Sequence, residues 1–334
     1  MINYDWTKDW NENWIIYKVR SGSQAYGTAL PTSDIDTKGI AIPPSNFYLS
    51  FFKKFEQYEQ KAPDPDCVIY DFKKFLMMVA ECNPNTMELL FVDESDILHM
   101  DRFGHILRQN RNLFLSAKVR YSFTGYAHSQ MARLKNHKQW NDSPPEKPKR
   151  SDFHLPEHES LMTHSQIIAI DKEFGFSKDK RPSTDAREMV AKKYGEEKAT
   201  AYFYEKRYRV AQREYDNYES WKQNRNKERH ETEVKFQYDT KHAMHTIRLL
   251  RMGKEILEEG VVKVRRPDAE ELLDIRLGKW SYERLLEEAN ILDKKCQEIY
   301  EAKAYKVPYE VDLEKIDELC YNILKSKFGI GGPR

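Results

Sequence analysis

The sequence predicts an α+β protein: a mixed-sheet domain over about residues 1–100, followed by a mainly helical domain over residues 101–334. Short apolar runs bounded by turn residues, typical of buried strands, occur in the first hundred positions, as at Trp14 to Val19. From about Arg102 onward, apolar residues recur at spacings of three and four, which indicates helices. The length of 334 residues suits one large domain or two ordinary ones.

Residues 19–44 organise the first domain, because a strand, a glycine turn and a second strand follow one another there. The turn contains Gly22 and Ser23, and we expect the second strand to carry Asp34 and Asp36. Alternate residues of a strand point to the same face, so the two aspartates are expected to project side by side.

This stretch combines two kinds of binding group within 15 residues. Paired carboxylates repel each other unless a cation lies between them, and magnesium suits a sparse set of hard oxygen ligands. The glycine turn lets backbone N–H groups approach an anion closely, and the hydroxyl of Ser23 can donate to the same anion. The alternative is a glycine-rich hairpin with two solvated aspartates. The combination of both features between two strands favours a site for phosphate and metal.

The run GSQAYGTALPTSDIDTKGI resembles the nucleotidyltransferase superfamily related to DNA polymerase beta. Within it, the run is most similar to the RNA repair pathway DNA polymerase beta family. Tyr26, Gly27, Ser33, Asp34 and Asp36 stand where the motif of that family expects them. The resemblance implies a nucleotidyltransferase palm with a mixed β-sheet, a nucleoside triphosphate substrate and one or two Mg²⁺ (or Mn²⁺) ions. It also implies that the glycines, Ser23, Tyr26 and Ser33 serve the nucleotide.

The same resemblance implies a third carboxylate on a neighbouring strand, and Asp71 is our candidate. Asp71 follows an apolar run and corresponds to the acidic residue before the Lys-Phe pair of the family. The alternative is that Asp71 caps a helix over residues 72–81, and one residue could do both. Glu56 and Glu59 are weaker candidates. The later run NPNTMELL also resembles the family, but the pattern by itself supports no catalytic role for Glu88.

In the second domain we expect a loop over residues 141–160 and one long helix over about residues 185–230. That helix carries a seam in which tyrosines such as Tyr204, Tyr208 and Tyr215 recur at heptad spacing. We interpret the seam as a packing surface, through which the chain could form a homo-oligomer. The alternative is an aromatic and basic rod on which RNA bases stack, given Arg209 and Arg213.

A second strong helix, over residues 241–257, places Lys241, His245 and Arg248 on one face. Basic groups on an otherwise apolar helix need anionic partners, so we expect contacts with phosphates of the nucleotide or acceptor. The alternative is an ion-pair network with Asp239 or nearby acids. His242 and His245 lack a third ligand at zinc spacing, so zinc is set aside.

The composition bounds the function further. With 55 Lys and Arg against 54 Asp and Glu, the net charge of +1 requires any nucleic-acid surface to be a local patch. No apolar run approaches the length of a membrane-spanning helix, and the N-terminus lacks a signal layout. The four scattered cysteines are expected to be reduced thiols of a cytoplasmic protein.

The expected reaction is transfer of a nucleoside monophosphate from an NTP to a hydroxyl group, with release of pyrophosphate. The resemblance implies an RNA acceptor, such as a tRNA end. The alternatives are nucleotidylation of a protein or small molecule, and a catalytically idle protein that serves binding or assembly.

Overall fold

The computed structural model describes residues 5–61, 65–224 and 227–330. The chain folds into two compact units: a sheet unit formed by Met1–Leu134 with Tyr238–Arg334, and an inserted unit formed by Lys135–Gln237. The domain boundary predicted near residue 100 therefore differs from the division of the structure. The C-terminal helices belong to the same unit as the sheet: α11, α12 and α13 pack on one another, and α14 packs against α3 and α5.

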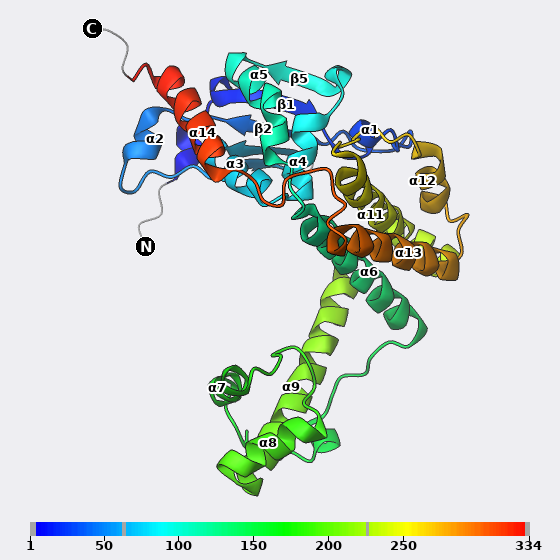
Figure 1. Ribbon diagram of the computed structural model, residues 1–334. Coiled ribbons are helices and arrows are strands. Elements are labelled where there is room, and N and C mark those ends of the chain that lie inside the picture. The colour runs from blue at the N-terminus through cyan, green and yellow to red at the C-terminus, as the bar shows by residue number, and fades with distance from the viewer. Residues whose placement is uncertain (1–4, 62–64, 225–226, 331–334) are drawn as a thin grey trace. The chain divides into compact units, whose positions relative to one another are not determined.

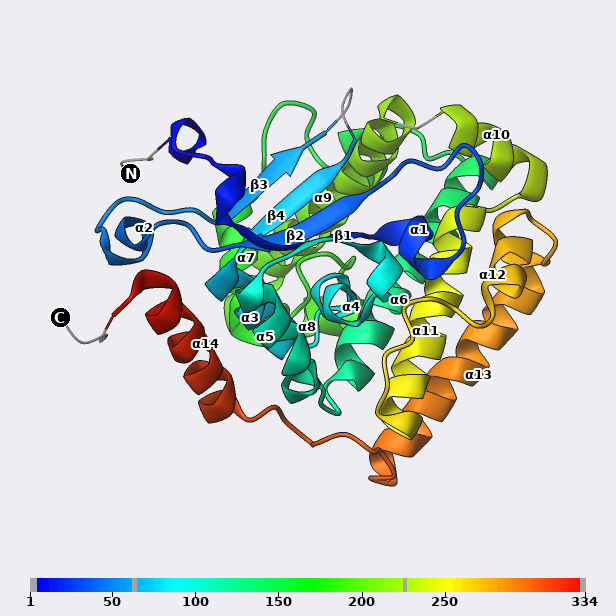
Figure 2. The ribbon, with the colours of Figure 1, turned by 90° about the horizontal axis from the view of Figure 1, so that it is seen from above.

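A five-stranded mixed sheet forms the centre of the sheet unit, with strand order β3-β4-β2-β1-β5. Figure 2 shows β3, β4, β2 and β1 side by side in that order. Only β2 and β4 run parallel; the other neighbours are antiparallel. The strands are β1 (Ile15–Arg20), β2 (Thr37–Ala41), β3 (Gln57–Gln60), β4 (Cys67–Asp71) and β5 (Ile97–Met100). The strand expected near residues 14–19 is present as β1, whereas β5 was not predicted.

The centre of the sheet is tightly packed around β1 and β2. Ile16, Tyr17 and Val19 of β1 are fully buried. Gly39 of β2 lies so close to β1 that an added Cβ would stand 2.5 Å from the carbonyl oxygen of Tyr17 and 2.8 Å from the side chain of Ile69. Glycine is therefore required at this position by the close approach of the two strands.

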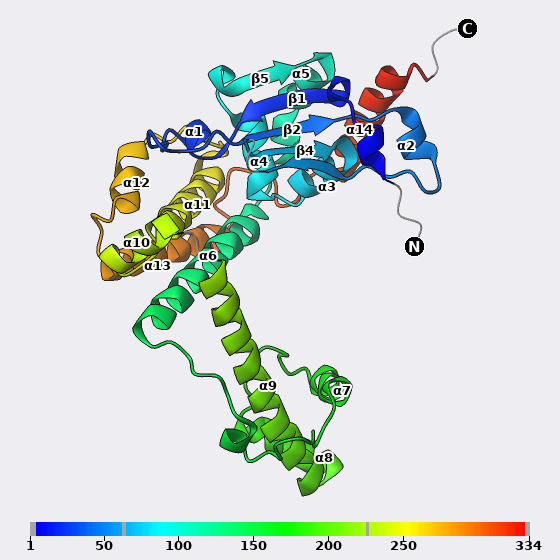
Figure 3. The same cartoon turned by 180° about the vertical axis from the view of Figure 1, so that it is seen from behind.

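Helices surround the sheet. Figures 1 and 3 show α1 at one end of the sheet, next to α12, and α2 with α14 at the opposite end. Helix α11 contributes the longest buried apolar face of the unit and packs against α12 and α13. The helices of this unit are α1 (Gly22–Tyr26), α2 (Ser45–Leu49), α3 (Phe72–Ala80), α4 (Pro84–Phe91), α5 (Arg102–Gln109), α11 (Thr240–Glu259), α12 (Ala269–Arg276), α13 (Tyr282–Glu301) and α14 (Leu313–Phe328). Helix α6 (Val119–Asp142) begins in the sheet unit and ends in the inserted unit.

The inserted unit is helical and has its own core. Its helices are α7 (His164–Phe174), α8 (Thr184–Tyr194), α9 (Glu196–Gln223) and α10 (Lys227–Phe236). The prediction of one helix over 185–230 is wrong, because Gly195, with φ of 86° and ψ of 163°, ends α8 before α9 begins. Between α6 and α7, the predicted loop contains one short 3₁₀ turn, Arg150–Phe153.

The tyrosine seam of the inserted unit is also shifted from its predicted position. The fully buried tyrosine of α9 is Tyr202, which packs with α7 and α8. Tyr204 and Tyr208 are half-buried and contact His154 and Phe153, respectively, of the preceding loop. The seam thus packs partly against its own unit. Across both units, none of the described helices is both long enough and apolar enough to cross a membrane.

We predict that Gly39→Ala lowers the free energy of unfolding by about 1–3 kcal/mol, because the new methyl group overlaps the backbone of β1. Urea denaturation followed by circular dichroism measures the change. The matched control is Gly125→Ala in α6, where an added Cβ meets no atom within 4 Å. Because alanine is the better helix former, the control should gain up to about 1 kcal/mol. Equal stability of Gly39→Ala and the wild type would contradict the prediction.

Candidate active site

The candidate site begins where β1 turns into α1. Gly22 has φ of 64°, a left-handed conformation that favours glycine. An added Cβ at Gly22 would lie 2.5 Å from Oδ2 of Asp36, so the carboxylate sits directly against this turn. Gly22 is thus required both by its backbone angle and by the approach of Asp36.

Asp34 and Asp36 lie in a loop and not in a strand, contrary to our expectation. The β1–β2 ladder ends with the pair Arg20 and Thr37, because the chain leaves the sheet at Ser21 to form α1. The backbone N–H of Ser21 donates to the carbonyl of Asp36 at 2.8 Å, which fixes the loop against the turn. Asp34 is exposed and Asp36 is half-buried.

Asp66 is a third carboxylate at this end of the sheet, and it was not predicted from the sequence. Strands β2 and β4 are parallel and in register from Thr37 opposite Cys67 to Ala41 opposite Asp71. Asp66 therefore enters β4 at the level where Asp36 enters β2, and the N–H of Thr37 donates to the carbonyl of Asp66 at 2.9 Å. The parallel pairing is the signal that identifies Asp66, and a single sequence does not reveal it.

Asp71 lies at the opposite end of β4. It is about 16 Å from Asp66, because a strand rises roughly 3.3 Å per residue. Its carboxylate accepts a hydrogen bond from the N–H of Lys74 at 3.0 Å, as the cap of α3, and another from the hydroxyl of Tyr48 at 2.7 Å. Burial raises the pKa of Asp71, and these hydrogen bonds partly offset the effect. The structure therefore supports the capping alternative and does not bring Asp71 together with Asp34 and Asp36.

The two weaker candidates are occupied elsewhere. Glu56 forms ion pairs with Lys54 and Lys74. Glu59, on β3, pairs with Lys61 at 3.4 Å and accepts a hydrogen bond from Gln57. Both carboxylates already have cationic or amide partners on the β3 side of the sheet, so neither joins the pair in the loop.

Positive charge reaches the loop from α11. Burial raises the pKa of Asp36, and the ammonium group of Lys241 is the largest influence that counteracts it. Asp66 and Asp34 raise the same pKa further, whereas Lys38 lowers it. Lys38 was not predicted; it lies in β2, two residues after Asp36, and burial lowers the pKa of its ammonium group.

Arg248, predicted as a phosphate ligand, is instead buried in the protein. Its guanidinium group forms an ion pair with Glu88 of α4 and lies 3.7 Å from the centre of the Tyr26 ring. The hydroxyl of Tyr26 donates to the second carboxylate oxygen of Glu88. Burial alone would lower the pKa of Arg248, but Glu88 and Tyr26 outweigh it and raise the pKa. Arg248, Tyr26 and Glu88 therefore form a structural anchor between α11, α1 and α4.

His245 lies one helical turn before Arg248 and is surrounded by cations. Burial is the main cause that lowers its pKa well below the usual value, and Arg248, Lys241, His242 and Arg276 act in the same direction. The imidazole is therefore neutral at pH 7. An anion bound nearby would reverse this preference, because it would favour the charged form.

Ser33 and Gly27 also have defined surroundings. The hydroxyl of Ser33 accepts a hydrogen bond from the N–H of Leu30 at 2.9 Å, and Arg276 of α12 reaches it at 3.5 Å. Gly27, with φ of 75°, ends α1 against the side chain of Arg265. Arg276 was not predicted, because its helix lies almost 250 positions further along the chain.

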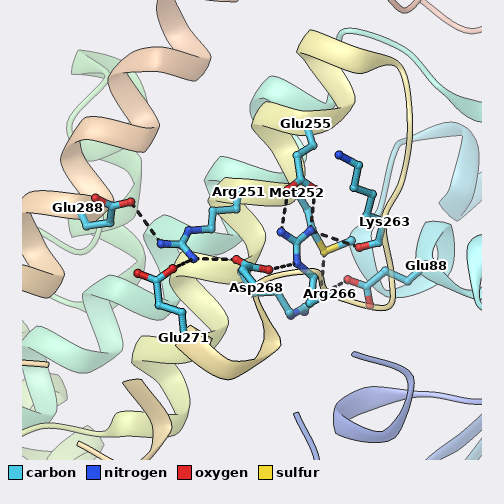
Figure 4. Close-up of polar contacts among 10 residues, drawn as sticks. Glu88, Arg251, Met252, Glu255, Lys263, Arg266, Asp268, Glu271 and Glu288 are labelled. Atoms are coloured by element: carbon cyan, nitrogen blue, oxygen red, sulfur yellow. Dashed lines mark hydrogen bonds and ion pairs between the residues drawn. The ribbon is translucent and has the colours of Figure 1, made fainter. Parts of the chain in front are cut away.

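A network of arginines and acids holds the segment between α11 and α12 in place. Figure 4 shows Asp268 between Arg251 and Arg266, with distances of 2.7 Å and 2.8 Å. Glu255 makes a bidentate pair with Arg266 at 2.6 Å and 2.7 Å. The N–H of Arg266 also donates to the carbonyl of Tyr26 at 3.1 Å. Through this hydrogen bond, the network holds the C-terminal end of α1.

Comparison with known proteins finds a matching family. Residues 6–149 match the RNA repair pathway DNA polymerase beta family. The match covers less than half of the chain. The match covers the whole sheet, the loop with Asp34 and Asp36, and α6, but not α11 or α12.

The curated relatives are uncharacterized. The chain is 31% identical to the uncharacterized protein YcgL of Bacillus subtilis (strain 168) over 27% of this chain and 34% of that protein. It is 27% identical to an uncharacterized 38.9 kDa protein from the nrdC-mobD intergenic region of Enterobacteria phage T4, over 35% of this chain and 38% of the phage protein. The matched segments thus span little more than a third of either relative. No solved structure matches the chain.

We predict that Asp36→Asn slightly stabilises the metal-free protein. A carboxyl group whose pKa is raised by folding contributes stability below its unfolded pKa, near 3.9, and loses that contribution as the pH rises through the folded pKa. At pH 7 the ionised group is therefore a cost that asparagine removes. Calorimetry in the presence of a chelator should show a melting temperature higher by roughly 1–2 °C, since solvent screens a half-exposed group.

The pH dependence provides the control for this prediction. At pH 3, where Asp36 is protonated in both states, the wild type and Asp36→Asn should melt together. A variant that is less stable than the wild type at pH 7 would mean that the attraction to Lys241 outweighs burial.

Proposed function

We propose that the chain transfers a nucleoside monophosphate from an NTP to a hydroxyl group at an RNA end and releases pyrophosphate. The observation that carries the proposal is the carboxylate of Asp36 held against Gly22, with Asp34 and Asp66 at the same end of the sheet. The match of residues 6–149 to a polymerase beta family supports the reaction class. The intact glycine turn and acidic loop argue against a catalytically idle protein.

The three carboxylates are the kind of donor that a hard divalent cation prefers. Asp34 and Asp66 are exposed, Asp36 is half-buried, and the ionised forms of Asp34 and Asp66 both raise the pKa of Asp36. Such an excess of negative charge favours a cation with oxygen ligands. These three residues would hold Mg²⁺ or Mn²⁺, which when bound would polarise the attacking hydroxyl group and neutralise the leaving group.

The residues of the chain have separate tasks in this proposal. Backbone N–H groups of Gly22 and Ser23 would hold the phosphates at the turn. Lys241 and Arg276 would balance the negative charge of the triphosphate, and neutral His245 would gain a proton as that charge arrives. Lys38, at the start of β2, would offset part of the negative charge around Asp36.

The bond changes define the reaction. The hydroxyl oxygen of the acceptor forms a bond to the α-phosphorus, and the bond from that phosphorus to the bridging oxygen of the β-phosphate breaks. The electron pair leaves with pyrophosphate. The proton of the hydroxyl group passes to a carboxylate of the acidic loop or to water. Positioning and charge neutralisation carry most of the rate enhancement in such transfers.

The direct test is incubation with each α-labelled NTP, Mg²⁺ and total RNA, with protein and small-molecule acceptors in parallel. Label in RNA supports the proposal. Label in a protein or a small molecule alone keeps the reaction class and replaces the acceptor. No label in any acceptor, with Mg²⁺ or Mn²⁺, would reject the proposal.

We predict that Asp34→Asn, Asp36→Asn and Asp66→Asn each reduce transfer by at least about a hundredfold, because each removes a charge that binds metal. Asp71→Asn is the matched control. It should retain transfer and lose about 1–2 kcal/mol of stability, because it weakens the cap of α3. Single-turnover rates and urea denaturation measure the two effects. Full activity of Asp66→Asn together with an inactive, stable Asp71→Asn would restore Asp71 as the third carboxylate.

We also predict that Lys241→Met raises the dissociation constant for NTP with Mg²⁺ about tenfold, because one positive charge near the triphosphate is lost. Lys254→Met is the control: it lies on the same helix and pairs with Glu258 on the protein surface at 2.6 Å. Isothermal titration calorimetry compares the two variants. Equal effects of both substitutions would mean that Lys241 acts only through the net charge.

A further inference from the structure

The inserted unit contains a cavity of about 380 Å³ between one face of α7 and one face of α9. Four cations line it: Lys206, Arg209 and Arg213 of α9, and Lys178 of the loop between α7 and α8. The residues of α9 follow one helix face, at spacings of three and four. Two carboxylates, Asp171 and Asp179, also line the cavity, so its walls carry two positive charges in excess.

Both carboxylates are already engaged. Asp171 is buried, and one of its oxygens accepts hydrogen bonds from Lys206 at 2.6 Å and from the hydroxyl of Tyr202 at 2.7 Å. Asp179 forms an ion pair with Arg213. The buried pair of Lys206 and Asp171 thus builds the floor of the cavity, and an unpaired Lys206 would be costly there.

Arg209 has most of its donors available. Within the described residues, it makes one long hydrogen bond to the carbonyl of Met162, 3.4 Å, and approaches Glu205 at 3.9 Å. Its Nε is buried and has no hydrogen-bond acceptor in this part of the chain. The guanidinium side chain is 31% exposed and that of Arg213 is 41% exposed, so a ligand can reach both. Two arginines one helical turn apart suit a tetrahedral oxyanion with several acceptor atoms.

The remaining walls fit a nucleotide unit. Ile167, Ile168 and Val210 supply apolar surface beside the cations. His164 also lines the cavity and is the first residue of α7, where the helix dipole is positive. A volume of about 380 Å³ lies within the usual range of small-molecule sites, roughly 300–1,000 Å³.

We propose that this cavity binds a phosphate group of a nucleotide, with Arg209 and Arg213 as its ligands, and that the phosphate belongs to the RNA acceptor strand. The RNA part of this inference rests on the function proposed above, whereas the phosphate chemistry does not. A free nucleotide would present the same chemistry, so the experiment distinguishes the two sources.

The test measures binding of a fluorescent single-stranded RNA of 20 nucleotides to the full chain over a range of salt concentrations. Arg209→Gln and Arg213→Gln should each weaken binding about fivefold. Each should also reduce the slope of log K against log salt by about 0.7, the value for one lost phosphate contact on a single strand. Lys206 is left unchanged, because its removal would leave the buried Asp171 without its cationic partner.

Arg207→Gln is the matched control. Arg207 is on the same helix, carries the same charge, contacts Phe203 and does not line the cavity. It should change neither the affinity nor the slope beyond a small general effect. Circular dichroism checks that each variant is folded.

Parallel titrations with inorganic phosphate and with an NTP identify the source. Loss of NTP or phosphate affinity in Arg209→Gln, with RNA unaffected, would retain the phosphate site and replace its ligand by a free nucleotide. Equal losses in the cavity variants and in Arg207→Gln, or no loss in either cavity variant, would overturn the inference. The transfer assay separates the two proposals: cavity-dependent RNA binding without any transfer by the wild type would reject the proposed function and keep the cavity.

Discussion

The ion pair between Arg248 and Glu88 is the interaction on which the site depends. It joins α11 to α4 across 160 positions of sequence, and the ring of Tyr26 closes it from α1. Both charged groups are buried, so removal of one partner would leave an uncompensated charge at a cost of about 3–5 kcal/mol. The start of α11, with Lys241 and His245, is oriented by this pair, and so is the end of α1. The acidic loop therefore faces cations that a distant segment supplies.

The charges around the loop form two groups. Arg248 and Glu88 are neutral as a pair and serve packing. The second group combines the acids Asp34, Asp36 and Asp66 with the cations Lys38, Lys241 and Arg276. Such a layout suits a ligand that carries both signs, as a triphosphate with its divalent cation does. Neutral His245 adds a group whose charge can follow that of the ligand.

The sequence predicted local elements around this site. The strand near residues 14–19, the glycine turn after it and the helix over residues 241–257 follow from patterns within 20 residues or so. The sequence did not predict Asp66, because its place beside Asp36 depends on the parallel pairing of β4 with β2, and pairing between strands is not a local property. Arg276 was missed for the same reason. Arg248 was predicted as a phosphate ligand, but it forms a buried ion pair with Glu88 instead. The prediction of one long helix was wrong at Gly195, because a single glycine can be tolerated within a helix or can end it.

The division of the sheet unit into two sequence segments, separated by the inserted unit, has a consequence for synthesis. A ribosome makes the sheet and the acidic loop first, then about a hundred residues of the inserted unit, and only afterwards α11 and α12. During that interval Glu88 has no arginine, and the acidic loop has no Lys241 or Arg276 facing it. The candidate site of the nascent chain thus stays incomplete until α12 has left the ribosome tunnel, and a chain that terminates before α11 lacks the cations that face the acidic loop.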